Sequence, residues 1–437
     1  MIRFALASVV WVAAALPLWA DIAITEVKTP AGFTAWLVEE PAVPAVSLEI
    51  LFLGGTSVDA PGKRGATHLM TGLLEEGAGD LDARGFAEAR DDLAASFGFD
   101  VGDDAVSVSA RFLSDTTDEA VALLEQALAA PSFAPDAVER VRDQVLAGLR
   151  SDAEDPDTIA ANAFAAATYG DHPYGSPGEG TLESVAALTR DDLIAAHRGA
   201  LARDRVVIAA AGDISAEKLA DIVDRLLARL PETGAPLPQD AVLAFDGGVT
   251  VVPYDTPQTV ISFAQPGLAR DDPDYFAAYL VNQILGGGGF TSRLTTEVRE
   301  KRGLTYGIYA YLADKDYADL LVGRAATANA RAAETVEVVR AEWARMAAEG
   351  PTAEELERAK TYLIGGYPLR FDGNDAIARI LVGMQAAGLP IDYVATRNDK
   401  IRSVSPQDAR RVAAQVLQPE ALSFVLVGQP ESVPASH

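Results

Sequence analysis

The sequence predicts an α+β protein made of two homologous domains, each a mostly antiparallel sheet with helices packed on one face. Three observations predict this class. The chain has 437 residues, which is enough for two packed cores. Segments that read as strands and helices recur in the same order in both halves. Between Ala105 and Phe112, apolar residues alternate with small or polar ones, which is typical of a strand with one buried face.

The internal repeat also sets the expected domain boundaries. Each half opens with two extended runs, which we expect to form a hairpin-like strand pair, and ends with a buried-type strand. Thr189 and Ser405 stand at matching helix starts, where a hydroxyl can cap the helix. We predict domains at 21–230 and 248–437, joined by a Pro-rich linker at 231–247. The matched segments are 36–38 with 249–252, 46–52 with 260–263, 68–77 with 279–288, 138–148 with 356–366, 188–193 with 404–409, and 206–213 with 424–429.

The chain begins with an apolar segment at 1–20 that has the features of a signal peptide. Arg3 precedes the apolar run, Pro17 interrupts it, and the small residue Ala20 ends it. The run is shorter than the roughly 20 apolar residues that a membrane-spanning helix needs. We predict cleavage near Ala20, export to the periplasm, and no membrane insertion after cleavage.

The composition narrows the range of partners. The formal net charge is −27, so the protein repels nucleic acid, and we expect no nucleic-acid partner. The chain has no Cys and 4 His, so disulfides are not used, and a zinc site rich in nitrogen and sulfur ligands has few residues to draw on. We expect the packed cores to supply the stability.

The segment Gly65–Gly79 reads as a zinc-binding helix without its ligands. Thr67 can cap this helix, and we expect it to end at Gly77 or Gly79. On such a helix, H-x-x-E-H places two imidazoles on one zinc ion, with the glutamate as general base. The sequence from His68 is instead H-L-M-T-G. A partly buried histidine bonded to a backbone carbonyl is the alternative interpretation of His68.

This motif, set after an extended run with two glycines and before L-L-E-E-G, resembles the insulinase/pitrilysin-type zinc metallopeptidases. The resemblance covers nearly the whole chain after the signal. It is to the small two-domain members, including the subunits of mitochondrial processing peptidase and similar bacterial heterodimers. By position, His68 keeps the first zinc ligand, while Thr71 replaces the catalytic glutamate and Gly72 the second histidine. Gly148 stands where the third ligand, a glutamate, is expected. The resemblance implies that this chain binds no zinc and that a homologous partner subunit holds it.

The run from Gly286 to Tyr309 carries the strongest positive signal of function. In the same family, an Arg and a Tyr seven residues later lie across from the zinc and handle the substrate. The matching residues here are Arg299 and Tyr306. A phenol can donate to the oxyanion of a tetrahedral intermediate, and a guanidinium can hold a peptide carbonyl or carboxylate. The structural alternatives stay open: Arg299 as a solvent-facing residue near a helix end, and Tyr306 as an aromatic on the apolar face of a strand.

A glycine-rich turn precedes this pair. We predict that it contacts the substrate, with a plain helix stop as the equal alternative. A phosphate-binding loop is disfavoured, because the run follows a helical segment rather than a strand and lacks G-K-[ST]. The residues of the predicted turn are Gly286, Gly287, Gly288, Gly289 and Phe290.

Two functions of different classes are consistent with these observations. In the first, the chain is a pseudo-peptidase subunit that contributes Arg299 and Tyr306 to a zinc-bearing partner, in a heterodimer that cleaves peptides. In the second, it is a non-catalytic peptide-binding or scaffold protein of the same fold. A self-sufficient peptidase with unusual ligands conflicts with Thr71, which cannot accept a proton as a glutamate does. An adjacent reading frame that encodes the intact motif would favour the first function.

Overall fold

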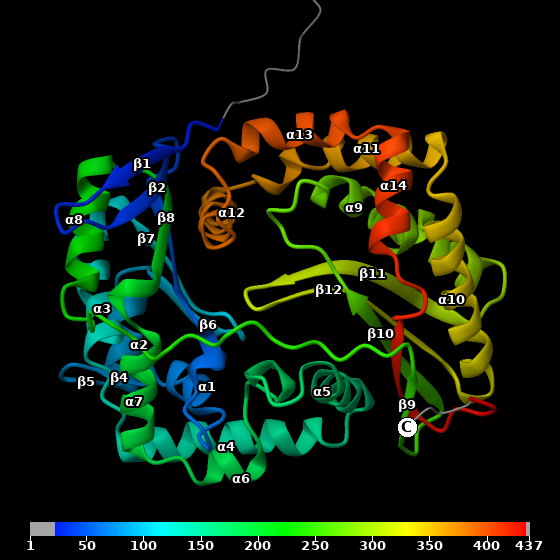
Figure 1. Cartoon of the computed structure of the whole chain (residues 1–437). Helices are drawn as coiled ribbons and strands as arrows, with labels where there is room; N and C mark the ends of the chain where they lie inside the picture. The colour runs from blue at the N-terminus through cyan, green and yellow to red at the C-terminus, as the bar shows by residue number, and fades with distance from the viewer. Residues whose placement is uncertain (1–21, 434–437) are drawn as a thin grey trace, which may run out of the picture.

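The computed structural model describes residues 22–433. Both halves contain a mixed, mostly antiparallel sheet with helices, so the predicted α+β class is confirmed (Figure 1). The signal peptide predicted at 1–20 lies outside the described residues. In the described part of the chain, no helix is long and apolar enough to cross a membrane.

The first sheet has six strands in the order β1-β2-β8-β3-β7-β6 within residues 22–433. β8 is parallel to β2 and antiparallel to β3. Successive β8 residues Ala209, Ala210 and Ala211 are fully buried, so both faces of this strand are covered. The strands are β1 (Thr25–Lys28), β2 (Thr34–Glu39), β3 (Ala45–Leu53), β6 (Ser96–Val101), β7 (Ala105–Leu113) and β8 (Val206–Gly212), and a small separate pair is β4 (Gly77–Ala78) and β5 (Leu81–Asp82).

The second sheet repeats this topology in the order β11-β12-β10-β13-β9. β13 is parallel to β9 and antiparallel to β10, as β8 is to β2 and β3. The expectation that the two opening strands of each half pair as a hairpin is therefore wrong. The last strand of each half lies between them, because its two apolar faces favour a central position in a sheet. The strands are β9 (Val249–Pro253), β10 (Gln258–Pro266), β11 (Thr305–Lys315), β12 (Ala318–Ala328) and β13 (Ser423–Gly428).

The helices also follow the repeat. Thr189 and Ser405 cap α7 and α14, each through a capping box, as predicted. The first-half helices are α1 (Ala66–Thr71), α2 (Ala83–Asp92), α3 (Thr117–Ala129), α4 (Pro135–Asp152), α5 (Pro156–Tyr169), α6 (Leu182–Ala186), α7 (Arg190–Ala200) and α8 (Ala216–Leu227). The second-half helices are α9 (Tyr275–Asn282), α10 (Ala332–Glu349), α11 (Ala353–Gly365), α12 (Asn374–Ala386), α13 (Tyr393–Ser403) and α14 (Pro406–Val416), with π-helical segments η5 (Gln283–Gly287) and η7 (Thr295–Glu300).

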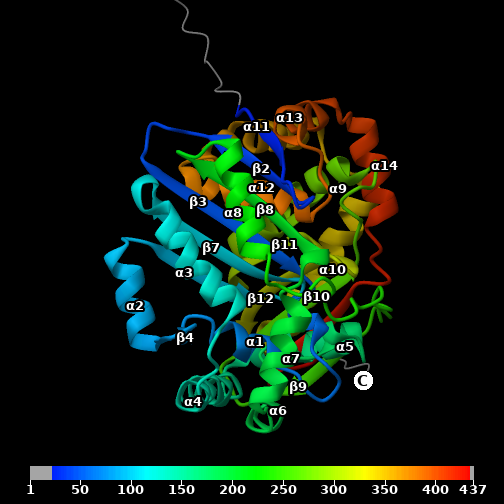
Figure 2. The same ribbon diagram turned by 90° about the vertical axis from the view of Figure 1, so that its left-hand side faces the viewer.

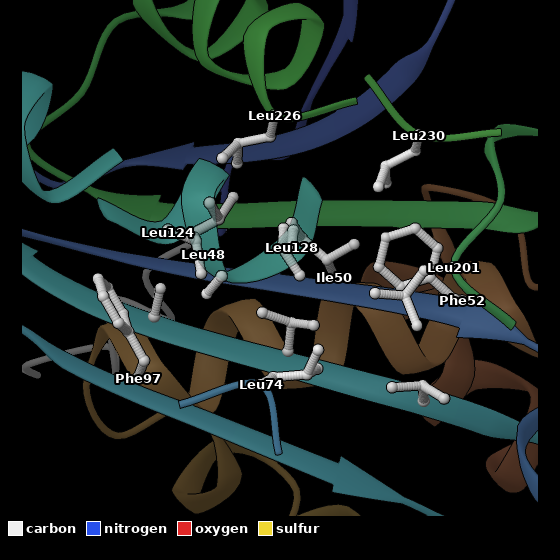
Figure 3. Packing of buried hydrophobic residues seen from close by; sticks show 14 of the residues in the cluster. Leu48, Ile50, Phe52, Leu74, Phe97, Leu124, Leu128, Leu201, Leu226 and Leu230 are labelled. Carbon is white, nitrogen blue, oxygen red and sulfur yellow. The ribbon is translucent and has the colours of Figure 1, made fainter. Parts of the chain in front are cut away.

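A hydrophobic core lies between each sheet and the helices of its own half. In the first half, Leu48 and Ile50 of β3 meet Leu124 of α3 and Leu226 of α8 (Figure 3). The alternating run in β7 is confirmed, because its apolar side chains join this core. The second half has a separate core that includes Trp343 of α10.

One helix from each half packs against the sheet of the other half, and we call these two helices, α12 and α5, the lent helices. α12 crosses the first sheet on the face opposite α3 and α8 (Figure 2), where Leu381 packs in a cluster with Trp36. α5 lies against the second sheet, where Ala160 packs with Val260 and Val427. The halves are therefore joined by helix exchange as well as by the connecting chain.

The connecting chain from α8 to β9 contains no helix or strand at 231–248. In Figure 1 it runs as a long loop from the first half to the second. The domain boundaries drawn from the repeat stay predictions, since the exchanged helices give each half a part of the other.

Candidate functional site

The His68 segment forms a shorter helix than predicted. α1 ends at Thr71, Gly72 is its C-cap, and the chain continues as turns up to Gly77. Glycine is among the poorest helix formers, so Gly72 is a natural end point. The prediction of a helix that continues to Gly77 or Gly79 is wrong.

The start of α1 is held by an aspartate rather than by Thr67. Gly65 is the N-cap, with a φ of 92° that favours glycine. Asp59 Oδ2 accepts from the Gly65 amide at 2.8 Å, and Oδ1 accepts from the amide and hydroxyl of Thr67 at 2.8 and 2.7 Å. These bonds satisfy donors of the first turn, so the expected capping by Thr67 is wrong.

His68 lines a cavity of about 930 Å³ in the first half, which we call the His68 cavity. Its side chain is half-buried and makes no hydrogen bond with any described residue. Across the cavity, α4 contributes Leu149, whereas Gly148 does not border the cavity and is exposed. Successive helical residues point about 100° apart, so an offset of one residue changes the face. The structure therefore brings Leu149, and not the predicted Gly148, toward His68.

The residues around His68 do not fit a zinc ion. The Thr71 hydroxyl donates to the carbonyl of Thr67 at 2.8 Å, Gly72 has no side chain, and Leu149 is apolar. Zinc needs three or four nitrogen, sulfur or oxygen ligands. Among residues 22–433, no three His, Cys, Asp or Glu side chains stand close enough together to hold a metal ion.

The His68 cavity is also lined by carboxylates that sequence reasoning missed: Asp103, Asp152, Glu179 and Glu183. They come from a hairpin turn, the end of α4, the loop before α6, and α6 itself. Residues so far apart show no spacing in the sequence, and only the fold collects them. Their charge favours a cationic group in the cavity, and a cation already reaches Asp103 there: Lys315 of the second half pairs with it.

In the second half, the structure brings Arg299 and Phe290 together. The guanidinium carbon of Arg299 lies 4.6 Å from the centre of the Phe290 ring. Tyr306, at the start of β11, is 90% exposed, and its side chain has no hydrogen bond or ring contact with any described residue. Neither Arg299 nor Tyr306 borders the His68 cavity. Tyr306 thus lies on the surface, whereas Arg299 is half-buried against Phe290.

Part of the predicted glycine turn is needed for packing against β11. Its first two glycines lie in the π-helical segment η5, a distortion often found at functional sites. A Cβ at Gly286 would come within 2.7 Å of the Ala310 backbone nitrogen, so the close contact with β11 requires glycine there. Gly289 has a φ of 58°, in the left-handed region. Phe290, next in the chain, is 70% exposed.

The fold and this site define a class of protein: a two-domain α+β chain with the architecture of a metallopeptidase, in which residues 22–433 bring no set of metal ligands together. Residues 35–182 match the family model described as insulinase (peptidase family M16), and residues 187–363 match the peptidase M16 inactive domain. The chain belongs to the insulinase family, peptidase family M16, and the resemblance seen in the sequence is confirmed.

The relatives carry names of both kinds, peptidase and non-peptidase. The chain is 26% identical over 405 residues to the Non-peptidase homolog YmxG of Helicobacter pylori, covering 92% of this chain and 93% of that protein. It is 28% identical over 393 residues to an uncharacterized zinc protease of Streptomyces coelicolor, covering 86% and 83%. A crystal structure described as the peptidase M16 inactive domain from Pseudomonas fluorescens has a TM-score of 0.87 at 30% identity, covering 95% and 99%. Activity must therefore be argued from the residues of this chain.

Proposed function

We propose that this protein is a catalytically incomplete subunit of a zinc peptidase, which supplies Arg299 and Tyr306 to a homologous partner subunit that holds the zinc. The observation that carries the proposal is Tyr306, whose ring is 90% exposed at the start of a strand and has no partner among the described residues. Exposed aromatic side chains gather where proteins meet peptides or other proteins. Following the predicted signal peptide, we further propose that the pair works in the periplasm.

The state of the His68 cavity supports an incomplete subunit. The cavity has a volume of about 930 Å³, but only His68 remains of the three ligand positions. Thr71 points its hydroxyl at its own helix and cannot serve as a general base. One relative, which matches this chain over 93% of its length, is named a non-peptidase homologue. That name agrees with a loss of independent activity.

The chemistry required of this chain is simple. A carbonyl under attack becomes an oxyanion, and the hydroxyl of Tyr306 can donate to it. The guanidinium of Arg299 can hold a carbonyl or carboxylate of the peptide. When bound in the partner, zinc supplies the activated water.

A non-catalytic peptide-binding or scaffold role is the second candidate. The carboxylates of the His68 cavity favour it, because Asp152, Glu179 and Glu183 suit the Lys or Arg side chains of a basic peptide. Such a protein needs no zinc-bearing partner. The two candidates differ in whether the side chain of Tyr306 affects peptide cleavage.

The test begins with the native complex. The tagged protein is purified from its host, and the expected outcome is co-purification of a homologous chain with an intact H-x-x-E-H motif. The pair is then reconstituted with variants. Tyr306→Phe should assemble normally by size-exclusion chromatography and lose turnover by roughly 10² to 10³, the usual cost of one oxyanion donor. Arg299→Ala should also weaken substrate binding, because a charge-assisted contact is lost.

Matched controls separate this role from general damage. Tyr362→Phe changes another tyrosine, 69% exposed on α11, and should cleave like the unaltered pair. Cleavage at the unaltered rate by both the Tyr306→Phe and the Arg299→Ala pairs would contradict a shared site and leave the scaffold role as the better account.

A further inference from the structure

A cavity of about 330 Å³ in the second half is lined by arginines and aromatic rings, and we call it the arginine cavity. Its arginines are Arg270, Arg370, Arg379 and Arg397, and Asp314 is the one acidic residue of its lining among the described residues. The formal net charge of the whole chain is −27. In so acidic a chain, a cluster of arginines indicates a binding site for a specific anion rather than a generally basic surface.

The arginine cavity holds the place in the second half that the His68 cavity holds in the first. The repeat matches His68 with Tyr279 and, directly after a matched segment, Leu149 with Tyr367. Both tyrosines line the arginine cavity. α12 lines it as well, just as the matching helix α5 lines the His68 cavity. The fold therefore builds two related cavities, and the second carries no remnant of the zinc motif.

Arg397 is the residue that most clearly lacks a counter-ion. It is 5% exposed, and its guanidinium carbon lies 4.1 Å from the centre of the Tyr367 ring. Its hydrogen bonds go to neutral acceptors, the Leu363 carbonyl at 3.3 Å and Asn398 Oδ1 at 3.0 Å. It forms no ion pair with any residue between 22 and 433. A buried cation without a counter-ion is costly, and an anionic ligand would offset that cost.

Arg270 is already engaged and serves the walls of the cavity. Its guanidinium donates to the hydroxyls of Tyr275 and, at 2.9 Å, Tyr393, and it lies 3.7 Å from Asp314. The charge of Arg270 therefore neutralises that of Asp314. Burial raises the pKa of Tyr275 to about 12, still further from neutral pH than its ordinary value of 10.0, so Tyr275 adds no charge to this wall. Arg370 is exposed at the rim, and its side chain has no partner among the described residues.

We propose that the arginine cavity binds the carboxylate of a small aromatic or apolar acid, with Arg397 and Arg370 on the carboxylate and the rings of Tyr279 and Tyr367 against its body. A guanidinium fork matches a carboxylate, aromatic walls accept a flat apolar group, and a volume of about 330 Å³ suits a ligand of this size. Two sources offer this chemistry, the C-terminal residue of a peptide and a free aromatic acid. The site lies within this chain alone, so it does not depend on the proposed subunit role.

The test is calorimetric titration of the purified chain, without any partner, at neutral pH. The probes are N-acetyl-Ala-Ala-Phe, its C-terminal amide, phenylacetate and inorganic phosphate. The acid should bind at least roughly tenfold more tightly than its amide, because the charge-assisted contact needs the carboxylate. Tighter binding of the tripeptide assigns the site to peptide ends, and tighter binding of phenylacetate assigns it to free acids.

Variants locate the binding. Arg397→Met removes the buried charge and keeps an apolar stem, and Arg370→Ala alters only the rim of the cavity. Each substitution should weaken the binding of the acid by roughly tenfold. Arg198→Ala changes an exposed arginine of α7, outside the cavity, and should bind as the unaltered chain does. Circular dichroism melts check that each variant folds. The proposal is overturned by acid binding no tighter than amide binding, by unchanged affinity in both cavity variants, or by tighter binding of inorganic phosphate than of either acid.

Discussion

The His68 cavity and the arginine cavity occupy matching places in the two halves but are lined by side chains of opposite charge. Carboxylates such as Asp152 and Glu183 surround the first, and arginines such as Arg397 line the second. Both sit beside the helix that follows the two opening strands and beside the helix lent by α5 or α12. Strand order is set by which faces must be buried, whereas a cavity wall only has to leave space. The comparison shows that the repeat constrains the packing and leaves the chemistry of the cavity free to diverge.

The lent helices differ in a similar way. α12 presents large apolar residues to the first sheet, including the buried Leu381, Val382 and Met384. α5 presents the small Ala160 to β10 and β13, while Tyr169 at its other end packs against Ala264 and Leu320. The apolar area buried by a side chain scales with its size. We therefore expect the contact of α12 with the first sheet to contribute more to stability than the contact around Ile159 and Ala160 of α5.

The largest expected effect is on the free energy of unfolding, and it comes from a substitution in the core of the second half. Trp343 is fully buried, and its indole N–H donates to Gln265 Oε1 at 2.6 Å. Trp343→Ala leaves a cavity in a packed core, so we expect it to lower the free energy of unfolding by about 3–5 kcal/mol. Urea unfolding followed by circular dichroism measures this loss. Trp343→Phe, which keeps an aromatic ring, is the control and should lose less.

The same variant tests whether the halves are coupled. After the predicted signal, the tryptophans are Trp36 and Trp343, so in Trp343→Ala the fluorescence reports on Trp36 alone. Trp36 lies in the first sheet beneath α12. If the helix exchange couples the halves, the Trp36 signal changes at the same lowered urea concentration as the circular dichroism. An unshifted Trp36 transition would show that the two cores unfold independently.

The second effect concerns the lent helices. Leu381→Ala on α12 removes a fully buried side chain between the halves, and we expect a loss of about 2–5 kcal/mol. Ile159→Ala on α5 removes a side chain that is only half-buried, so its cost should be clearly smaller. Urea midpoints of the two variants give the comparison. Equal losses would contradict the unequal roles assigned to α12 and α5.

Much of the fold could be predicted because its signals are local. The alternation in β7 and the hydroxyl caps at Thr189 and Ser405 each depend on a few neighbouring residues, and the structure has them as expected. The insertion of β8 between β2 and β3 depends on pairing between residues more than 150 positions apart. Sequence order favoured the hairpin, and only the burial of both faces of β8 decides against it.

The candidate site shows the same limit at finer scale. His68 was found because it belongs to a contiguous motif, but the third ligand position was placed at Gly148, one residue away from Leu149, which lines the cavity. Counting along the chain cannot fix the rotation of one helix against another. The arginine cavity was missed entirely, because Arg270 and Arg397 stand far apart in the sequence and form no motif.

A smaller effect should appear at the contact between the first sheet and α12. Glu49 of β3 is 5% exposed, and burial raises its pKa to about 7, with Asp375 and Asp100 adding to the rise and Arg379 opposing it. The folded state therefore holds this proton up to about pH 7, whereas the unfolded chain releases it near its ordinary value of 4.5. The stability linked to this proton is complete below that ordinary value and is lost as the pH rises toward 7.

The variant Glu49→Gln removes this titration. The difference in unfolding free energy between variant and unaltered protein should therefore grow in favour of the variant from pH 5 to pH 8, by on the order of 1–3 kcal/mol. Urea unfolding at several pH values measures it. Glu88→Gln on α2, an exposed acid with 62% side-chain exposure, is the control and should give a flat difference. A flat difference for Glu49→Gln as well would mean that the Glu49 proton is not linked to folding.

The smallest expected effect is at His68 itself, and it is the sharpest test of the comparison with intact zinc sites. One imidazole beside Thr71, Gly72 and Leu149 offers too few ligands, so elemental analysis should find only a small fraction of a zinc ion per molecule, unchanged in His68→Ala. Stoichiometric zinc that disappears in His68→Ala would contradict this.

The positive control restores the ligands by combining Thr71→Glu and Gly72→His with a glutamate on α4. A Cβ at Gly72 meets nothing closer than Val141 at 3.4 Å, and the backbone φ of −65° suits histidine, so the replacement has room. Gly72 and Gly148 are both exposed and outside the lining of the cavity, so the test of α4 is the comparison between the two combinations: because the Leu149 side chain borders the cavity, the combination with Leu149→Glu should hold more zinc than the combination with Gly148→Glu.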